Sequence, residues 1–352
     1  MRLDQLTLPQ RLLAGLGCVV VLLFLGVVAL LAIWQARANL AMEHERSAAP
    51  EGWADSLRAF GRIPDLAGLL PAATDSADGA WAVYDSTRTW RVTGAEHAYR
   101  ARTGSIQADA ADSALWRRIA TDTALDAYAR AARAASWHAT DRALAMAPEA
   151  ARRNFMLFRE PQYSSVRDAG RALVTRALMR LDRGDRAGAR ADLAAATGLG
   201  FQMLRHEPGY IGFLVGRATL ASGLHGWSVY ATATHDSTLG ARVEELRARF
   251  AARPGASSGL LMVETDTAIS IVRDGGLAPG LRFFAVGQML AGSAMRPTGL
   301  LFGPPRRARA AIRDLARDPD PDVARLGEIA DRTAGRMNAF GFPGLMREVG
   351  NR

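Results

Sequence analysis

The strongest hydrophobic pattern in the chain is an uninterrupted apolar run from Leu12 to Trp34, without charged, amide or hydroxyl side chains. At ~1.5 Å per residue, a helix over this run can cross a hydrocarbon layer of ~30 Å. Small side chains recur along it and would allow close approach to another membrane helix, while a tryptophan ends it as an interfacial anchor. These positions are Gly15, Gly17, Gly26, Ala29 and Trp34. We therefore expect one transmembrane helix over residues 12–34, after a short flank over 1–11.

A cleavable signal peptide is the alternative for this run. Its apolar core would span ~7 to 15 residues and precede a small-x-small cleavage site. Ala36-Arg37-Ala38 supplies such a site, but the apolar run here is longer than that core. Cys18 lies in the middle of the run rather than at its end, which argues against lipid attachment there. The length of the run favours a retained anchor.

The charges beside the run indicate its orientation. Arg2 and Arg11 precede it, whereas Arg37 and Arg46 follow it among acidic residues. Because arginines on short flanks favour the cytoplasmic side, this balance leans toward a cytoplasmic N-terminus. We expect the main domain on the other side of the membrane, in the bacterial periplasm.

Helical periodicity begins near residue 112 and is clearest between residues 166 and 197. Apolar residues from Val166 to Leu181 form one broad stripe, and Gly184 ends that segment. A second helix follows, so the pattern predicts an antiparallel pair joined by a short turn. The contact positions of the pair would be Leu173, Ala177, Gly184, Ala189, Leu193 and Ala196.

This helix pair resembles one tetratricopeptide-type unit, in which small residues mark the contact between paired helices and a glycine ends the first helix. The resemblance covers about thirty residues, and it departs from the pattern at Arg176 and Arg180, which stand where apolar residues are usual. A second pair, over 306–335, turns at residues 318–322 and resembles a single HEAT-type unit, in which proline and aspartate start the second helix. Both resemblances imply a solenoid-like helical body and indicate no activity.

The segment 276–305 is apolar but carries regularly spaced polar residues, so a second span is not expected. It is interpreted either as a buried core helix or as an apolar patch that lies on the membrane or on a partner. The residues of such a surface, with the arginines that follow, would be Phe283, Phe284, Met289, Arg306, Arg307 and Arg309.

The predicted fold is therefore mostly α, with an irregular α-helical solenoid-like domain behind the transmembrane helix. Residues 35–111 form a stalk and a small mixed segment, and the pattern over 79–94 allows one β-hairpin. Residues 112–255 form the helical-pair region, and residues 256–352 form a C-terminal helical region.

The composition excludes several classes of function but does not indicate a particular one. Cys18 is the single cysteine, so the soluble part holds no disulfide, thiolate zinc site or thiol nucleophile. The formal net charge is +9, and every basic side chain other than histidine is an arginine. That excess favours contact with anionic lipid headgroups or an acidic partner surface. Nucleic-acid binding is not expected, because the arginines are not interleaved with stacking aromatics.

Three groups of residues could form chemical sites, and each can also be explained by a structural role. Ser257 lies in a G-x-S-x-G spacing, but the residues before it end a charged helix and no histidine follows residue 235. His206 and Glu207 form the best pair of metal-ligating residue types, although a helix boundary beside Pro208 explains them equally well. The aspartates at 318, 320 and 322 resemble the start of a calcium loop but lack its later glycine and glutamate, so they are interpreted as helix caps.

We therefore expect a non-catalytic, membrane-anchored scaffold or assembly subunit of a larger membrane complex, such as a photosynthetic or respiratory one. No catalytic residue, metal site or cofactor is predicted. Its partners would be other membrane-complex subunits and membrane lipid, with no nucleic acid. Two alternatives remain: an envelope hydrolase whose site cannot be recognised in one sequence, and a peptide-binding helical-repeat adaptor.

Overall fold

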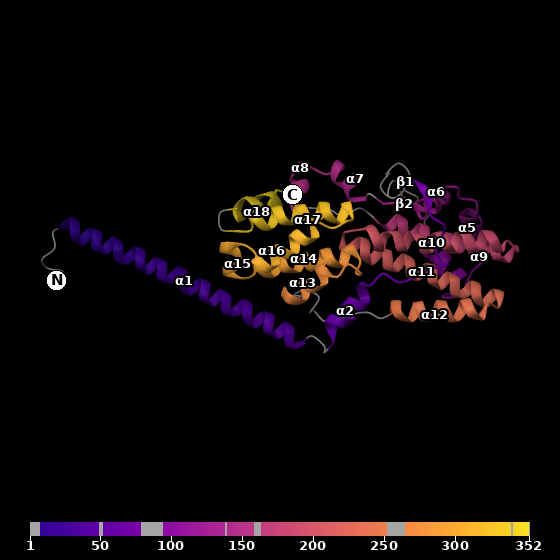
Figure 1. Ribbon diagram of the computed structural model, residues 1–352, viewed down its shortest axis with the longest axis horizontal. Helices are drawn as coiled ribbons and strands as arrows, with labels where there is room; N and C mark the ends of the chain where they lie inside the picture. Colours follow the sequence, from indigo (N-terminus) through magenta and orange to yellow (C-terminus); the bar gives the residue numbers. More distant parts are fainter. Residues whose placement is uncertain are drawn as a thin grey trace.

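The computed structural model describes residues 8–48, 52–78, 94–137, 139–157, 163–251, 265–338 and 341–351. A long helix, α1 (Leu8–Ala48), extends away from a body built almost entirely of helices (Figure 1). The predicted fold class, mostly α behind one apolar N-terminal helix, is confirmed.

Helix α1 carries the apolar run. Its segment Leu16–Ala41 covers 26 residues with a mean hydropathy of 3.1 and is long and apolar enough to cross a membrane. A signal sequence near the N-terminus also meets this criterion of length and hydropathy. Leu22 and Phe24 are each 67% exposed, so the body does not cover these side chains.

Four successive helices form the centre of the body. Each packs against the next along the chain, and short turns connect them. Their bounds are α9 (Ser164–Asp182), α10 (Arg186–His206), α11 (Tyr210–Thr234) and α12 (Ser237–Ala251). The predicted helix pair is α9 and α10, and its apolar contact residues are all fully buried. Gly184 forms the turn with a φ of +81°, a backbone conformation that residues with a side chain rarely adopt.

Helices α10 and α11 approach each other through glycines. A Cβ atom at Gly200 would lie 2.4 Å from the backbone nitrogen of Leu220, and one at Gly223 would lie 2.8 Å from Oγ1 of Thr197. Since real side chains do not tolerate such contacts, these two positions let the backbones come close. The tertiary packing, rather than helix propensity, explains glycine inside both helices.

The N-terminal segments pack against this centre. They comprise α2 (Trp53–Gly61), β1 (Thr74–Asp78), α4 (Ala95–Arg102), α5 (Asp112–Ala120), α6 (Ala124–Ala131) and β2 (Ala134–Ser136). Leu57 and Leu66 are fully buried in the main core, which corrects the expectation of a stalk between residues 53 and 70. Strands β1 and β2 pair in parallel. The expected hairpin over 79–94 lies outside the described residues except for Gly94.

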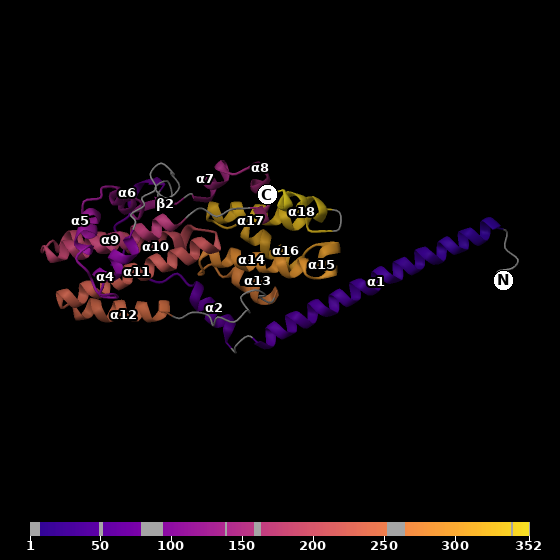
Figure 2. The same ribbon diagram turned by 180° about the vertical axis from the view of Figure 1, so that it is seen from behind.

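The C-terminal half of the body is a second group of helices. It contains α7 (Ala139–Met146), α8 (Glu149–Arg153), the 3₁₀ turn η2 (Phe155–Leu157), α13 (Thr265–Arg273), α14 (Pro279–Ala294), α15 (Pro297–Phe302), α16 (Arg306–Leu315), α17 (Pro321–Arg336) and α18 (Phe342–Gly350). Figure 2 shows from behind that α15 and α18 lie at the end of the body that faces α1. Helix α17 begins with Asp320 as its N-cap and Pro321 in its first turn, as the pattern predicted.

Helix α14 corrects the expectation of an apolar surface patch. Phe283 and Met289 are 6% and 4% exposed, and both belong to the main core. Phe284 is half-buried, and its ring stacks on Tyr210 with centroids 4.3 Å apart. The core-helix interpretation of this segment is therefore confirmed, because α14 packs against α11, α13 and α17 and buries Phe283 and Met289.

A buried ion pair connects the first helix pair. The guanidinium of Arg176 donates from Nε and Nη2 to the two carboxylate oxygens of Asp192, at 2.9 and 2.8 Å, and from Nη1 to Asp126 at 2.9 Å. Arg180 also lies 3.1 Å from Asp192. This network explains why arginines occupy two positions that are usually apolar in tetratricopeptide-type units.

We predict that replacing Arg176 by alanine lowers the free energy of unfolding by ~3 to 5 kcal/mol, because Asp192 would remain buried without its main cation. Denaturant unfolding of the detergent-solubilised chain, followed by near-ultraviolet circular dichroism, measures this loss. Arg180→Ala is the matched control on the same helix, and its partly exposed guanidinium should cost ~1 kcal/mol or less. Equal losses for the two variants would contradict the structural role assigned to Arg176.

Candidate functional site

The best candidate site is a pocket of about 680 Å³ between α4, α11 and α12. Its wall combines apolar side chains with several groups that can form hydrogen bonds. The lining residues are Tyr99, Ala221, Ser222, Leu224, His225, Glu244, Arg247, Ala248, Phe250 and Ala251. Its volume falls within the size range of small-ligand sites.

A tyrosine–histidine pair lies in the inner part of this pocket. The hydroxyl of Tyr99 is 3.0 Å from Nδ1 of His225, and their rings meet edge to face. Tyr99 comes from the short helix α4, which starts after Gly94 in the left-handed region at a φ of +88°. His225 comes from the middle of α11, so the pair joins elements 126 residues apart in the chain.

Charged groups lie at the outer side of the pocket on α12. Glu244 accepts hydrogen bonds from Oγ of Ser228 at 2.7 Å and from Nη1 of Arg247 at 2.6 Å. Because Glu244 and Arg247 occupy positions i and i+3 of one helix, they lie on the same face. The mouth of the pocket therefore presents both a carboxylate and a guanidinium.

Burial keeps the inner pair neutral. Desolvation raises the pKa of Tyr99. Desolvation lowers the pKa of His225, and the cation of Arg247 lowers it further. At the mouth, the hydrogen bonds from Ser228 and Arg247 lower the pKa of Glu244. Near neutral pH, the pocket thus offers uncharged hydrogen-bonding groups inside and an ion pair outside.

The hydroxyls beside the pocket do not form a Ser–His nucleophile arrangement. Oγ of Ser222 donates to the carbonyl of Ala218 at 3.0 Å, and Oγ of Ser228 donates to Glu244. Nucleophilic catalysis by a serine would need its hydroxyl within hydrogen-bonding distance of a histidine that accepts its proton. Ser222 and Ser228 donate to a carbonyl and a carboxylate instead, and the hydroxyl close to His225 is that of Tyr99.

His206 and Glu207 each have a separate structural role. Nδ1 of His206 lies 3.1 Å from Asp320, the residue that caps α17. Glu207 is 1% exposed and accepts hydrogen bonds from the indole of Trp137 at 2.6 Å and the hydroxyl of Tyr163 at 2.8 Å. The two side chains therefore do not converge on one ligand position.

The aspartates at the start of α17 also have separate roles. Asp318 forms an ion pair with Arg282 at 2.5 Å, while Asp320 accepts hydrogen bonds from the backbone of Asp322 and Val323. Hydrogen bonds from His206 and these amides lower the pKa of Asp320 despite its burial. Asp320 is the N-cap of α17, and Asp322 lies in its first turn.

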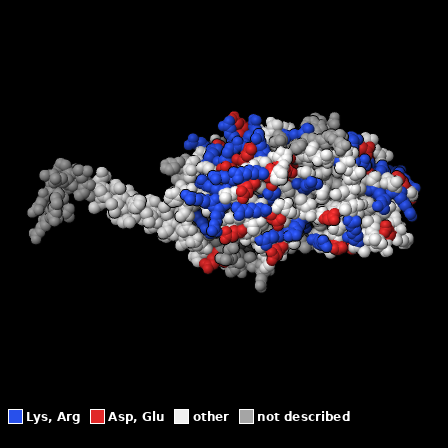
Figure 3. All heavy atoms as spheres, viewed as in Figure 1, with Lys and Arg blue, Asp and Glu red and all other residues white. Residues whose placement is uncertain are grey.

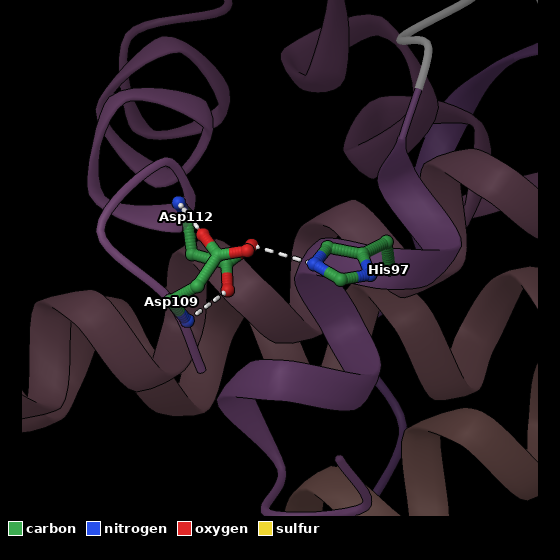
Figure 4. Close-up of side chains that lie close together, drawn as sticks. All are labelled: His97, Asp109 and Asp112. Carbon is green, nitrogen blue, oxygen red and sulfur yellow. Dashed lines mark hydrogen bonds and ion pairs between the residues drawn. The ribbon is translucent and has the colours of Figure 1, made fainter. Parts of the chain in front are cut away.

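A cluster that the sequence did not suggest consists of His97, Asp109 and Asp112 (Figure 4). Each offers one ligand atom, and these atoms lie within 4.8 Å of one another, which is compatible with a metal ion. Both carboxylates already have structural partners. Asp109 accepts from the backbone of Asp112 and Asp112 accepts from that of Asp109, while Nε2 of His97 is 2.9 Å from Asp112. The reciprocal hydrogen bonds lie at the start of α5, and the contact between His97 and Asp112 links α5 to α4.

The remaining predicted positions lie in different places. Ser257 is outside the described residues. Arg306 and Arg307 are exposed, whereas Arg309 is half-buried and donates to the carbonyls of Pro304 and Phe302. On α1, nothing lies within 4 Å of a Cβ at Gly17 or Gly26; Ala29 and Trp34 are exposed.

Sequence reasoning missed the pocket for a physical reason. Tyr99 stands in a short segment without a strong apolar period, and His225 stands within a long apolar helix. Neither has a neighbouring residue in the sequence that suggests chemistry. Only the packing of α4 against the central helices brings the two side chains together.

No protein-family model, curated protein or solved structure matches the chain. The resemblances to tetratricopeptide-type and HEAT-type units therefore remain resemblances of single helix pairs. The arguments for a function come from the geometry of this chain alone.

We predict that acidification destabilises the body through His225. Its pKa in the folded chain is below the value of 6.5 for the free side chain, so the unfolded chain binds more protons as the pH falls. The stability that the neutral imidazole contributes is complete above about pH 6.5 and is lost as the pH falls toward the folded pKa. Thermal unfolding between pH 5 and 7.5 should show this slope in the wild type and a smaller slope in His225→Gln.

Arg247→Gln should also reduce this slope, because it removes a cation that lowers the pKa of His225. Arg249→Gln is the matched control, since Arg249 pairs with Glu245 on the exposed side of α12. An unchanged pH slope in His225→Gln would contradict the assignment.

Proposed function

We propose that this chain is a non-catalytic scaffold or assembly subunit that α1 anchors in a membrane. The body covers surfaces of partner subunits, while the anchor packs beside other spans of a larger membrane complex. The proposal places the N-terminus in the cytoplasm and the body in the periplasm.

The observation that carries this proposal is that α1 has two different sides. Leu31, Gln35 and Ala38 are the shielded positions among the described side chains of its C-terminal half, and α1 contacts α15 of the body. At 3.6 residues per turn, Gly26 and Ala29 lie roughly 120° to 180° around the helix from these three positions. The small residues thus point away from the body, where they allow close approach of a second span.

The polar groups of the body support a scaffold in preference to the hydrolase alternative. His206 and Glu207, the pair considered for chemistry, have separate structural partners. The first turns of α11 also expose Ile211 and Leu214, at 54% and 37%, on a helix that is otherwise central to the fold. These apolar side chains are suited to contact with another subunit.

We predict that Gly26→Leu, combined with Ala29→Leu, separates the chain from its partners. Mild-detergent extraction of membranes should yield a complex for the wild type, identified by blue-native electrophoresis and mass spectrometry. In the variant, the larger side chains should prevent close helix contact and reduce co-purification at least tenfold, while the chain remains in the membrane fraction.

Val27→Leu together with Val28→Leu is the matched control, since it enlarges neighbouring side chains in the same span. It should leave the complex intact. A wild-type chain that is extracted as a monomer without any partner would overturn the proposal.

We predict that the body is accessible from outside the cytoplasm. A cysteine at Ala241, an exposed position on α12, should react with an impermeant maleimide in intact spheroplasts of a Cys18→Ala background. A cysteine at Thr7, before the apolar run, should react only after permeabilisation. The reverse labelling pattern would show the opposite orientation.

A further inference from the structure

We infer that the edge of the body formed by α15 and the start of α16 docks on the surface of the bilayer that holds α1, with Phe302 at the interface and Arg306 and Arg307 on anionic headgroups. This inference rests on the proposed anchoring by α1. It adds a lipid-binding surface that fixes the orientation of the body relative to the bilayer.

The first argument is the position of α15 along the axis of α1. The apolar run ends at Trp34, and Gln35 is the first polar residue after it. The shielded positions Leu31, Gln35 and Ala38 lie on both sides of that end, and α15 is in contact with α1. Because the end of an apolar span lies at the membrane–water interface, α15 lies at the same level.

The chemistry of this edge is the second argument. Phe302 ends α15 and is 76% exposed, the largest exposed fraction among the large hydrophobic residues that the structure describes. Met295, just before α15, is 39% exposed. Aromatic and apolar side chains next to arginines are typical of segments that lie in the interfacial region of a bilayer.

The charge of the C-terminal region is the third argument. Residues 295–352 contain 11 arginines and seven acidic residues. Three of the seven acids lie at the start of α17: Asp318 pairs with Arg282, Asp320 caps the helix and pairs with His206, and Asp322 is buried in its first turn. Figure 3 shows arginine side chains gathered on the part of the body next to the anchor. The outward charge of this region is therefore positive and complements an anionic lipid surface.

Arg306 and Arg307 are the arginines best placed for this contact. Both are exposed in the first turn of α16, four and five residues after the end of α15. Arg307 lies 3.7 Å from Asp266, but both side chains are 81% exposed, so water weakens that pair. Such arginines can approach headgroups, and each contributes about a fivefold change in surface binding.

The test measures the depth of α15 in full-length chain reconstituted in vesicles. Thr298→Cys in a Cys18→Ala background places a fluorophore one helical turn before Phe302, on the same face of α15. Ala241→Cys on α12, at the opposite end of the body (Figure 1), is the reference position. Vesicles contain phosphatidylcholine alone or with one third phosphatidylglycerol, and brominated acyl chains quench a fluorophore that reaches the bilayer.

We expect quenching at position 298 to be at least fivefold stronger than at position 241 in anionic vesicles, and weaker at position 298 in neutral vesicles or at high salt. Phe302→Ser and the double variant Arg306→Gln, Arg307→Gln should each reduce the signal at 298. Arg242→Gln with Arg249→Gln removes two exposed charges from α12 and should leave the signal unchanged.

The outcomes separate this inference from the anchoring itself. Loss of the chain from vesicles in alkaline carbonate would overturn the anchoring, and the docking with it. A retained chain without quenching at position 298 would overturn the docking alone. Equal quenching in neutral and anionic vesicles would overturn the role of the two arginines.

Discussion

The close approach of α10 and α11 is the constraint on which the rest of the body depends. Glycines at their crossing leave no room for a side chain, and a Cβ at Gly200 would meet the backbone of the partner helix. This contact sets the separation of two long helices, and α9 and α12 pack on either side of them. The pocket, the buried ion pair and the second helix group all take their positions from this central stack.

Charged residues inside the body act mainly as connections between segments. Arg176 joins α9 to Asp192 of α10 and to Asp126 of α6, and Arg282 of α14 bonds to Asp318 before α17. Arg217 of α11 donates to the carbonyls of Phe60 and Phe250, which ties α2 and α12 to the centre. Because an unpaired buried charge is costly, these pairs specify which elements meet. Such groups resemble chemical sites in a sequence but are structural in the fold.

Helix α1 is in contact with the body as well as joined to it along the chain. Helix α1 extends past the end of its apolar run and touches α15, so the contact between anchor and body lies near the level of Trp34. The opposite side of the same helix carries small residues that the body leaves uncovered. Under the proposed anchoring, this arrangement would hold the body at a defined height and leave the far side of α1 open to a neighbour.

The sequence by itself determined the features that depend on local periodicity. The apolar run, the α9–α10 pair with Gly184 at its turn and the start of α17 at Asp320 all follow from side-chain spacing within one or two turns of helix. Only the tertiary structure decided which apolar faces are covered. It placed Phe283 and Met289 in the core, packed Leu57 and Leu66 into the body, and joined Tyr99 to His225. A periodic pattern shows that a helix has an apolar face, but long-range packing decides what that face meets.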